Sequence, residues 1–243
     1  MTIRYRTKGF VFKKNDRHES DRIFSVFTYD FGRVEVTAKA IRKSTSKLRS
    51  GIDVFYLSEV EFIQGKNGKT LTDAIVVKKF NSPILDYRKL EVLCRIVEVL
   101  DLFIKGQEKD EAVFDLLNEM FDILSNQKVV FKNHNLIFQY FFWNFISLQG
   151  YRIQTKNCAS CQEKLNPCRV YFSGKYGGVI CGSCASEKKT HSKPCLLINA
   201  DIVKVLRLIL EKDCITTSKL KVEPFSQNLL EVVSKEAVSE FCS

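Results

Sequence analysis

The spacing of the apolar residues changes near Pro83, which limits the chain to folds with separate β and α-helical parts. Before Pro83 the apolar residues alternate with polar ones. In the run Arg33 to Ala40, for example, Val34, Val36 and Ala38 share one face, as in a strand with one buried side. After Pro83 the apolar residues recur at steps of three and four, which is the period of an amphipathic helix. The sequence therefore predicts a β unit followed by an α-helical one.

The first 80 residues contain five runs with strand character. They are Ile3 to Lys8, Ile23 to Tyr29, Arg33 to Ala40, Val54 to Ile63 and Leu71 to Val77. Turn-forming stretches such as Asn15 to Ser20 and Gln64 to Gly68 lie between them. Five short strands in so few residues predict a small closed barrel. A five-stranded OB-type barrel is the economical choice, and such barrels bind oligonucleotides on strands 2 and 3 and on the adjoining loops.

The rest of the chain predicts a helical domain. Helical spacing is seen from Leu90 to Ile104, from Val113 to Leu124 behind the acidic pair Asp110-Glu111, from Asn135 to Gln149, from Ala200 to Glu211 and from Phe225 to Phe241. Gly150 is placed to end the third of these helices. That helix is crowded with aromatic residues, which predicts burial in a core. The alternative is a groove for a partner peptide.

Two CxxC pairs, Cys158/Cys161 and Cys181/Cys184, are separated by 19 residues. This spacing predicts a four-cysteine zinc site, with Val170 to Phe172 and Val179-Ile180 forming a hairpin between the pairs. Four thiolates leave no open position on the metal, so we expect one structural ion in a zinc-ribbon-like insert. Three further residues lie near enough in sequence to replace a ligand: Cys168, Cys195 and His191. Redox-active or merely buried thiols are the alternative.

The chain has 243 residues, 38 of them Lys or Arg and 28 Asp or Glu, which gives a net charge of +10. We expect four segments: an OB-fold barrel (1–80), the first part of a helical domain (81–156), a zinc-ribbon-like insert (157–199) and the C-terminal part of the helical domain (200–243). Their basic and acidic residues number 17 and 9, 9 and 10, 6 and 2, and 6 and 7, in that order. The excess is concentrated in the first and third segments. Such asymmetry favours a polyanionic partner, because binding releases counterions from its phosphates. A basic surface kept for solubility is the alternative.

A basic stretch from Lys39 to Arg49 follows the third predicted strand and contains no acidic residue. We expect a flexible polar loop there that follows a phosphate backbone. The candidate DNA-binding residues are Arg22, Arg33, Lys39, Arg42, Lys43, Lys47 and Arg49. Three aromatic residues, Tyr29, Phe31 and Phe55, are either stacking platforms for unpaired bases or barrel core.

No catalytic constellation emerges. Gly68-Lys69-Thr70 resembles the end of a phosphate-binding P-loop, but Ile63 occupies the position of a required Gly, and a strand is predicted to follow. The three His residues are unrelated in position, and none is paired with a nucleophile. We therefore expect no enzyme. No membrane-spanning segment or signal peptide is predicted, so we expect a cytoplasmic protein with reduced thiols.

At this point a resemblance becomes visible. Its motifs, in order, are Glu19-Ser20-Asp21-Arg22-Ile23, Phe27-Thr28, Phe31-Gly32-Arg33, Ala38-Lys39 with Arg42-Lys43, Leu71-Thr72-Asp73-Ala74 and Gly150-Tyr151 before the first CxxC. Together they closely resemble the bacterial RecO family of DNA repair proteins over about residues 5 to 185. Two features depart from the common pattern. Ala40 stands where relatives commonly have Gly, and some relatives lack the cysteines, so zinc would be stabilising here.

The resemblance implies an N-terminal OB-fold and a helical domain with an inserted zinc site. It also implies binding to single- and double-stranded DNA, annealing of complementary strands, partnership with RecR, and contact with the C-terminal tail of single-strand binding protein. The hypothesis is a non-catalytic mediator of the RecF pathway, associated with the nucleoid, that helps to load RecA. An RNA-binding OB and zinc-ribbon module in translation or transcription is the alternative. An enzyme with a zinc-stabilised nucleic-acid domain would need catalytic groups that the sequence does not provide.

Overall fold

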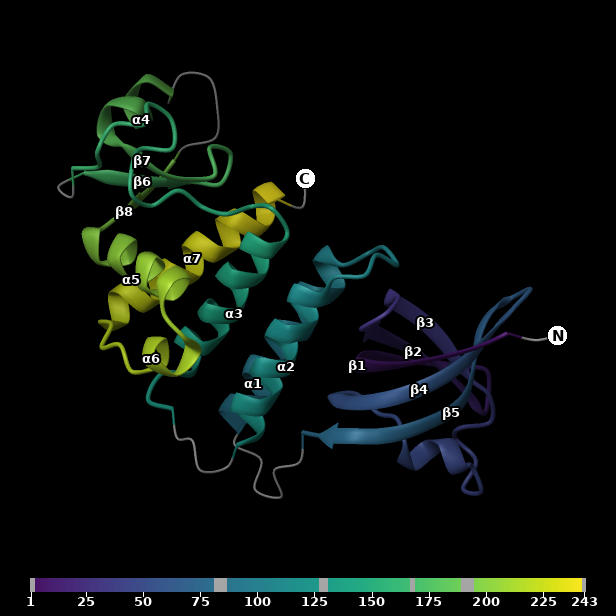
Figure 1. Cartoon of the computed structure of the whole chain (residues 1–243). Helices are drawn as coiled ribbons and strands as arrows, with labels where there is room; N and C mark the ends of the chain where they lie inside the picture. Colours follow the sequence, from purple (N-terminus) through teal and green to yellow (C-terminus); the bar gives the residue numbers. More distant parts are fainter. Residues whose placement is uncertain (1–2, 81–86, 127–130, 167–168, 189–194, 242–243) are drawn as a thin grey trace. The chain divides into compact units, whose positions relative to one another are not determined.

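The computed structural model describes residues 3–80, 87–126, 131–166, 169–188 and 195–241. The chain divides into two compact units, 1–130 and 131–243. Both units are drawn in Figure 1. No helix among the described residues is long and apolar enough to cross a membrane.

The first unit contains five strands, a short 3-10 helix and two α-helices. Its elements are β1 (Arg4–Arg17), β2 (Asp21–Thr28), β3 (Gly32–Ala38), η1 (Lys47–Ser50), β4 (Tyr56–Gly65), β5 (Gly68–Lys79), α1 (Tyr87–Phe103) and α2 (Glu111–Ser125). The strands form a closed barrel in the order β1-β2-β3-β5-β4. Four strand pairs are antiparallel, and the barrel closes through a short parallel pairing of β3 with β5 at Val36/Lys69 and Thr37/Thr70. The predicted five-stranded OB-type barrel is confirmed.

The alternation that predicts the strands is explained by the barrel core. Val34, Val36 and Ala38 of β3 are all buried in one cluster with Phe24 and Val26 of β2. The strands extend beyond the apolar runs, because backbone pairing at β1–β2 continues to Arg17/Asp21, where the side chains are no longer buried. The apolar pattern thus identified each strand but understated the lengths of β1, β2 and β5, whereas β3 ends at Ala38, two residues earlier than predicted.

Both helices of the first unit contact the outer surface of the barrel. Phe10 of β1 and Phe27 of β2 point away from the barrel core, yet both are buried. Their rings pack against Phe114 of α2, with centroids 5.0 Å and 6.4 Å apart, and Phe10 also lies 4.9 Å from Phe121. The outward aromatic residues of β1 and β2 therefore serve as a second core between barrel and helices.

The second unit has a helical part and a small three-stranded sheet. Its elements are α3 (His134–Leu148), β6 (Val170–Ser173), β7 (Gly178–Cys181), α4 (Gly182–Lys188), β8 (Leu196–Ile198), α5 (Ala200–Glu211), α6 (Cys214–Ser218) and α7 (Pro224–Phe241). The sheet order is β7-β6-β8. The predicted hairpin is present as β6 and β7, whereas β8, α4 and α6 were not anticipated because each is too short for a periodic signal.

The aromatic residues of α3 are core residues, as predicted. Its members are all buried: Phe138, Tyr140, Phe141, Phe142, Trp143 and Phe145. Trp143 packs edge-on against Phe172 of β6 and donates a 3.0 Å hydrogen bond to Gln139. Asn133 caps the start of the helix, and Gly150, with φ of +90°, follows its end. Buried on almost every side, these rings leave no aromatic groove on α3 for a partner.

Candidate nucleic-acid interface and metal centre

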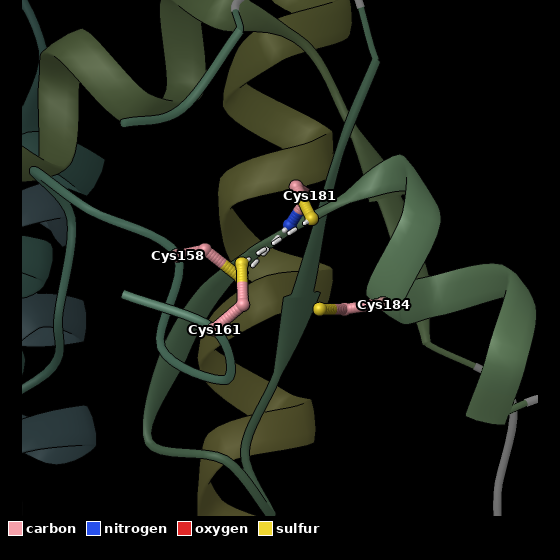
Figure 2. A group of neighbouring side chains, drawn as sticks. All are labelled: Cys158, Cys161, Cys181 and Cys184. Carbon is pink, nitrogen blue, oxygen red and sulfur yellow. Dashed lines mark hydrogen bonds between the residues drawn. The ribbon is translucent and has the colours of Figure 1, made fainter. Parts of the chain in front are cut away.

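The four cysteines of the two CxxC pairs come together in the second unit. Cys158 and Cys161 lie in a tight turn before β6, Cys181 ends β7 and Cys184 lies in α4. Backbone bonds shape the turn: Cys158 N–H donates to Glu163, and Gln162, with φ of +63°, donates back to Cys158. Figure 2 shows the four side chains gathered around one shared space.

The sulfur geometry fits a tetrahedral thiolate site. All four sulfur atoms lie within 4.8 Å of one another, and those of Cys161 and Cys181 are 3.9 Å apart. Zn–S bonds of about 2.3 Å in a tetrahedron place sulfur atoms about 3.8 Å apart. The backbone N–H of Cys181 also donates to the Cys158 sulfur over 3.3 Å. The four cysteines are therefore close enough to hold one metal ion with little movement.

The electrostatics of this cluster also favour a bound cation. Burial opposes ionisation of Cys158, but backbone N–H groups of Cys161, Cys181 and Ser160 favour its thiolate and lower its pKa to about 6. At Cys161 the Glu163 N–H favours the thiolate, yet the Cys158 thiol, burial and the thiols of Cys184 and Cys181 together outweigh it and raise the pKa to about 12. Closely spaced thiols cannot all ionise without a positive charge among them. A divalent ion would relieve this repulsion.

The other candidate ligands can now be placed. Cys195 packs against the buried cluster that contains Cys158 and Cys184, but its sulfur is not part of the four-thiol group. Cys168 and His191 lie outside the described residues.

The basic residues between Lys39 and Arg49 lie in the segment that connects β3 to β4. Lys39, Arg42, Lys43, Lys47 and Arg49 are all exposed. Within the described part of the chain, Lys43, Lys47 and Arg49 make no ion pair. These charges are available to a ligand.

The loop that carries these charges is more ordered than expected. Successive turns link Ala40 to Lys43 and Ser46 to Arg49, and the last residues form η1. Two apolar residues, Ile41 and Ile52, are buried in the barrel core, which anchors the segment at both ends. Gly51 approaches β5 so closely that a Cβ atom would lie 1.8 Å from the Ala74 oxygen. The charged side chains thus project from a supported platform.

Arg22 and Arg42 share one acidic partner on the barrel. The Arg22 Nε atom lies 2.6 Å from Asp16 Oδ1, and the Arg42 Nη1 atom lies 3.6 Å from Asp16 Oδ2. The hydrogen bond from Arg22, supported by the charges of both arginines, lowers the pKa of Asp16. Asp16 therefore stays ionised and offsets part of the positive charge here.

Arg33 differs from the other candidates because its guanidinium binds groups within the first unit. Its side chain is only 15% exposed and pairs with Asp101 of α1 at 2.9 Å. It also donates to the Ile104 carbonyl at 2.8 Å and lies over the Phe12 ring. The structure gives Arg33 a role in joining β3 to the end of α1.

The candidate stacking residues have partners within the first unit. Phe31 packs with Tyr5 and Phe62 against the barrel core. Tyr29 is 36% exposed, and the Lys109 ammonium lies 4.9 Å from its ring centre. Phe55 is half-buried, with φ of +65°. Of the three, Tyr29 exposes the largest fraction of its surface.

Two turns place further cations beside Lys39. Arg17 ends β1, and Lys66 and Lys69 lie in and after the β4–β5 turn. With Lys39 they line one polar pocket. Sequence reasoning missed these three residues, although the turns at Asn15 to Ser20 and Gln64 to Gly68 marked their positions. We call the cations from Arg17, Lys39 to Arg49, Lys66 and Lys69 the cationic rim; all of them are exposed except Lys69, which is partly buried.

A closed OB-type barrel with exposed cations, carried in one chain with a helical unit and a four-cysteine cluster suited to a metal ion, is typical of multidomain proteins that handle nucleic acids. Comparison with known families identifies one family for both parts of the chain. Residues 1–80 match the family model for the recombination protein O N terminus, and residues 84–230 match that for its C terminus. The chain belongs to the recombination protein O (RecO) family.

The curated relatives of this chain support the same family assignment. The chain is 30% identical to the DNA repair protein RecO of Dehalococcoides mccartyi strain 195 over 90% of this chain and 83% of the relative. It is 25% identical to that of Desulforamulus reducens, over 93% and 85%. It is 26% identical to that of Clostridium perfringens, over 84% of each.

Proposed function

We propose that this protein is a DNA repair and recombination mediator that binds single- and double-stranded DNA without sequence specificity and anneals complementary strands. Family membership supports the role in DNA repair and recombination. The observation that carries the DNA contact is the cationic rim, where Lys43, Lys47 and Arg49 are exposed on an ordered platform. Cations on such a surface bind phosphates and leave the bases unread.

The site of contact proposed here is the rim of the barrel. An OB-fold commonly binds oligonucleotides on strands 2 and 3, but the outward residues Phe10 and Phe27 are covered by α2. Arg33 is likewise taken up by α1. We therefore assign the principal contacts to Lys39, Arg42, Lys43, Lys47 and Arg49, with Arg22 beside them, and we leave Arg33 as a structural residue.

Annealing by this surface needs no catalysis. Two strands held on one cationic platform repel each other less and meet at a higher local concentration. Base pairing then supplies the free energy. The protein would act as a non-enzymatic mediator in the cytoplasm, at the nucleoid.

The partners proposed for this activity are RecR and the C-terminal tail of single-strand binding protein. With RecR, the protein would help to load RecA on DNA that single-strand binding protein has coated. The metal in the four-cysteine site is proposed to be one structural Zn²⁺, because four thiolates with this spacing suit zinc and leave it no free position. It would hold the turn before β6 against α4.

The test is the salt dependence of DNA affinity. Contact of the five loop cations with phosphates of single-stranded DNA contributes a slope of about −3.5 to log affinity against log salt, at about 0.7 per phosphate. Replacing all five with Ala should reduce the slope by that amount. The matched control removes five exposed lysines from the C-terminal segment: Lys204, Lys212, Lys219, Lys221 and Lys235. An unchanged slope in the loop variant, or an equal loss in the control, would reject the loop as the contact.

The RNA-binding module remains the second candidate, because a basic OB-type barrel suits either polynucleotide. Competition between single-stranded DNA and RNA of one sequence separates the two. Strand annealing on DNA coated with single-strand binding protein, with and without its acidic tail, then tests DNA handling and partner docking together.

A further inference from the structure

The end of the barrel contains a polar pocket of about 360 Å³. It lies between the β1–β2 turn and the β4–β5 turn, beside the end of β3. The residues that carry the argument are Arg17, Lys39, Lys66, Asn67, Lys69 and Thr70. Its volume is near the lower end of the range for small-molecule sites, about 300 to 1,000 Å³. The pocket is large enough for a phosphate group together with part of its sugar.

The charge of this pocket is strongly positive. Four cations line it, and the acidic residue among the lining is Asp21. The Asp21 carboxylate is already engaged: it accepts from the Ala40 N–H at 2.7 Å and from the Ser20 hydroxyl. The bond from Ala40, followed by that from Ser20, lowers the pKa of Asp21 and keeps it ionised. The lining therefore has a formal charge of +3 when His18 is neutral.

The motif Gly68-Lys69-Thr70 lines this pocket. It resembles the end of a P-loop but lacks the first glycine of that motif. It begins β5 directly after the hairpin turn, where Gly68 has φ of +112°. Lys69 is held in place by a 3.1 Å hydrogen bond to Gln107 in the connection between α1 and α2. Lys66 is exposed at the hairpin and makes no ion pair among the described residues. Lys69 is thus held in position, whereas the side chain of Lys66 can move to contact a ligand.

The chemistry of the lining excludes several ligands. Among the described residues that line the pocket, none has a large apolar or aromatic side chain except the ring of His18. Base stacking needs an aromatic platform, and an acidic peptide with an apolar anchor needs an apolar wall. A phosphate needs neither. Lysine ammonium groups, the Asn67 amide and the Thr70 hydroxyl are all suitable donors to phosphate oxygens.

We propose that this pocket binds the terminal phosphate of a DNA strand, so that the protein distinguishes phosphorylated strand ends from internal sites. A phosphomonoester carries about −1.5 to −2 charges near neutral pH, whereas an internal phosphodiester carries one. Four cations gathered around one volume match the higher charge density. This inference rests on the proposed DNA-binding function and adds a preferred position on the strand.

The experiment compares single-stranded oligonucleotides of one sequence that end in a 5′-phosphate, a 3′-phosphate or hydroxyls only. Affinity is measured by fluorescence anisotropy with the full chain. The additional charge should make one phosphorylated form bind about fivefold more tightly than the hydroxyl form, the ratio given by one further charge contact in water. The double variant Lys66→Gln/Lys69→Gln should bring this ratio to about one.

The matched control is Lys47→Gln/Arg49→Gln in the neighbouring loop, which should weaken all three oligonucleotides equally and keep the ratio. Lys66→Gln alone repeats the test at an exposed position, should Lys69→Gln disturb the fold through Gln107. Equal binding of all three forms by the unaltered protein would overturn the pocket assignment and leave DNA binding intact. Absence of DNA binding altogether would overturn both proposals.

Two competitors identify the source of the phosphate. A free nucleoside monophosphate should displace the phosphorylated oligonucleotide far less well than the unlabelled oligonucleotide does. Equal competition would mean that the ligand is a free nucleotide, and the DNA-end assignment would be wrong. An acidic peptide that displaces the oligonucleotide more strongly, and only when Lys66 is present, would also overturn it.

Discussion

Replacement of Arg33 by Ala should destabilise the first unit and leave the salt dependence of DNA binding unchanged. In the structure this guanidinium lies 2.9 Å from Asp101 Oδ1 and 3.1 Å from Glu35 Oε1. It also donates to the Ile104 carbonyl at 2.8 Å. These contacts tie β3 to the last turn of α1, so their loss acts on the packing of helix against barrel.

The size of the effect follows from burial and from the partners that remain. Removing one member of a buried ion pair costs about 3 to 5 kcal/mol, because the other charge is left without a partner. Here Glu35 is about half exposed, and Asp101 keeps Lys13 at 2.7 Å. The loss is then closer to that of one charged hydrogen bond plus the buried stem, about 2 to 3 kcal/mol.

Urea unfolding measures the change in the free energy of unfolding. The dependence of single-stranded DNA affinity on salt concentration measures how many phosphate contacts are lost. Lys47→Ala is the control, since Lys47 is exposed and makes no ion pair within the described residues. The control should change stability by less than about 0.5 kcal/mol and reduce the salt slope by about 0.7. If Arg33→Ala instead kept its stability and lost slope like the control, Arg33 would be a DNA contact and our account of its role would be wrong.

Three further predictions concern the metal site, one backbone position and pH. Cys161→Ser should reduce bound Zn²⁺ from one per chain to a small fraction, measured by elemental analysis after dialysis, while the salt slope of DNA binding stays the same; retained zinc would exclude Cys161 as a ligand. Ala40 has φ of +52°, so Ala40→Gly should raise the free energy of unfolding by about 0.5 to 1 kcal/mol, and a loss of stability in urea would contradict this. The hydrogen bond from Lys13, followed by that from Arg33, lowers the pKa of Asp101 below its usual value. The carboxyl of Asp101 therefore binds a proton less readily in the folded state than in the unfolded state. Its contribution to the free energy of unfolding is present above about pH 4 and is lost as the pH falls through the folded pKa. Asp101→Asn should make the free energy of unfolding less dependent on pH in that acidic range, and an acid unfolding profile identical to that of the unaltered protein would refute the assignment.

Much of the fold was readable from local spacing. A period of two placed β3, because Val34, Val36 and Ala38 must share a face wherever the strand lies. The two CxxC pairs identified all four cysteines of the cluster, since each pair brings its own two sulfur atoms together. Gly150 marked the end of α3 because few other residues adopt its backbone conformation.

The roles of individual charged residues could not be predicted from local spacing. Arg33 and Lys47 look alike in sequence, yet Arg33 meets a carbonyl 71 residues further along the chain, while Lys47 stays exposed. Likewise, nothing in the local spacing shows that Phe10 and Phe27 are covered by α2. Local periodicity depends on the backbone geometry of a few neighbouring residues, whereas the partner of a side chain depends on which distant elements pack beside it. The sequence therefore determined the barrel, the long helices and the four-cysteine cluster, whereas tertiary packing alone selected which of the basic residues remain exposed.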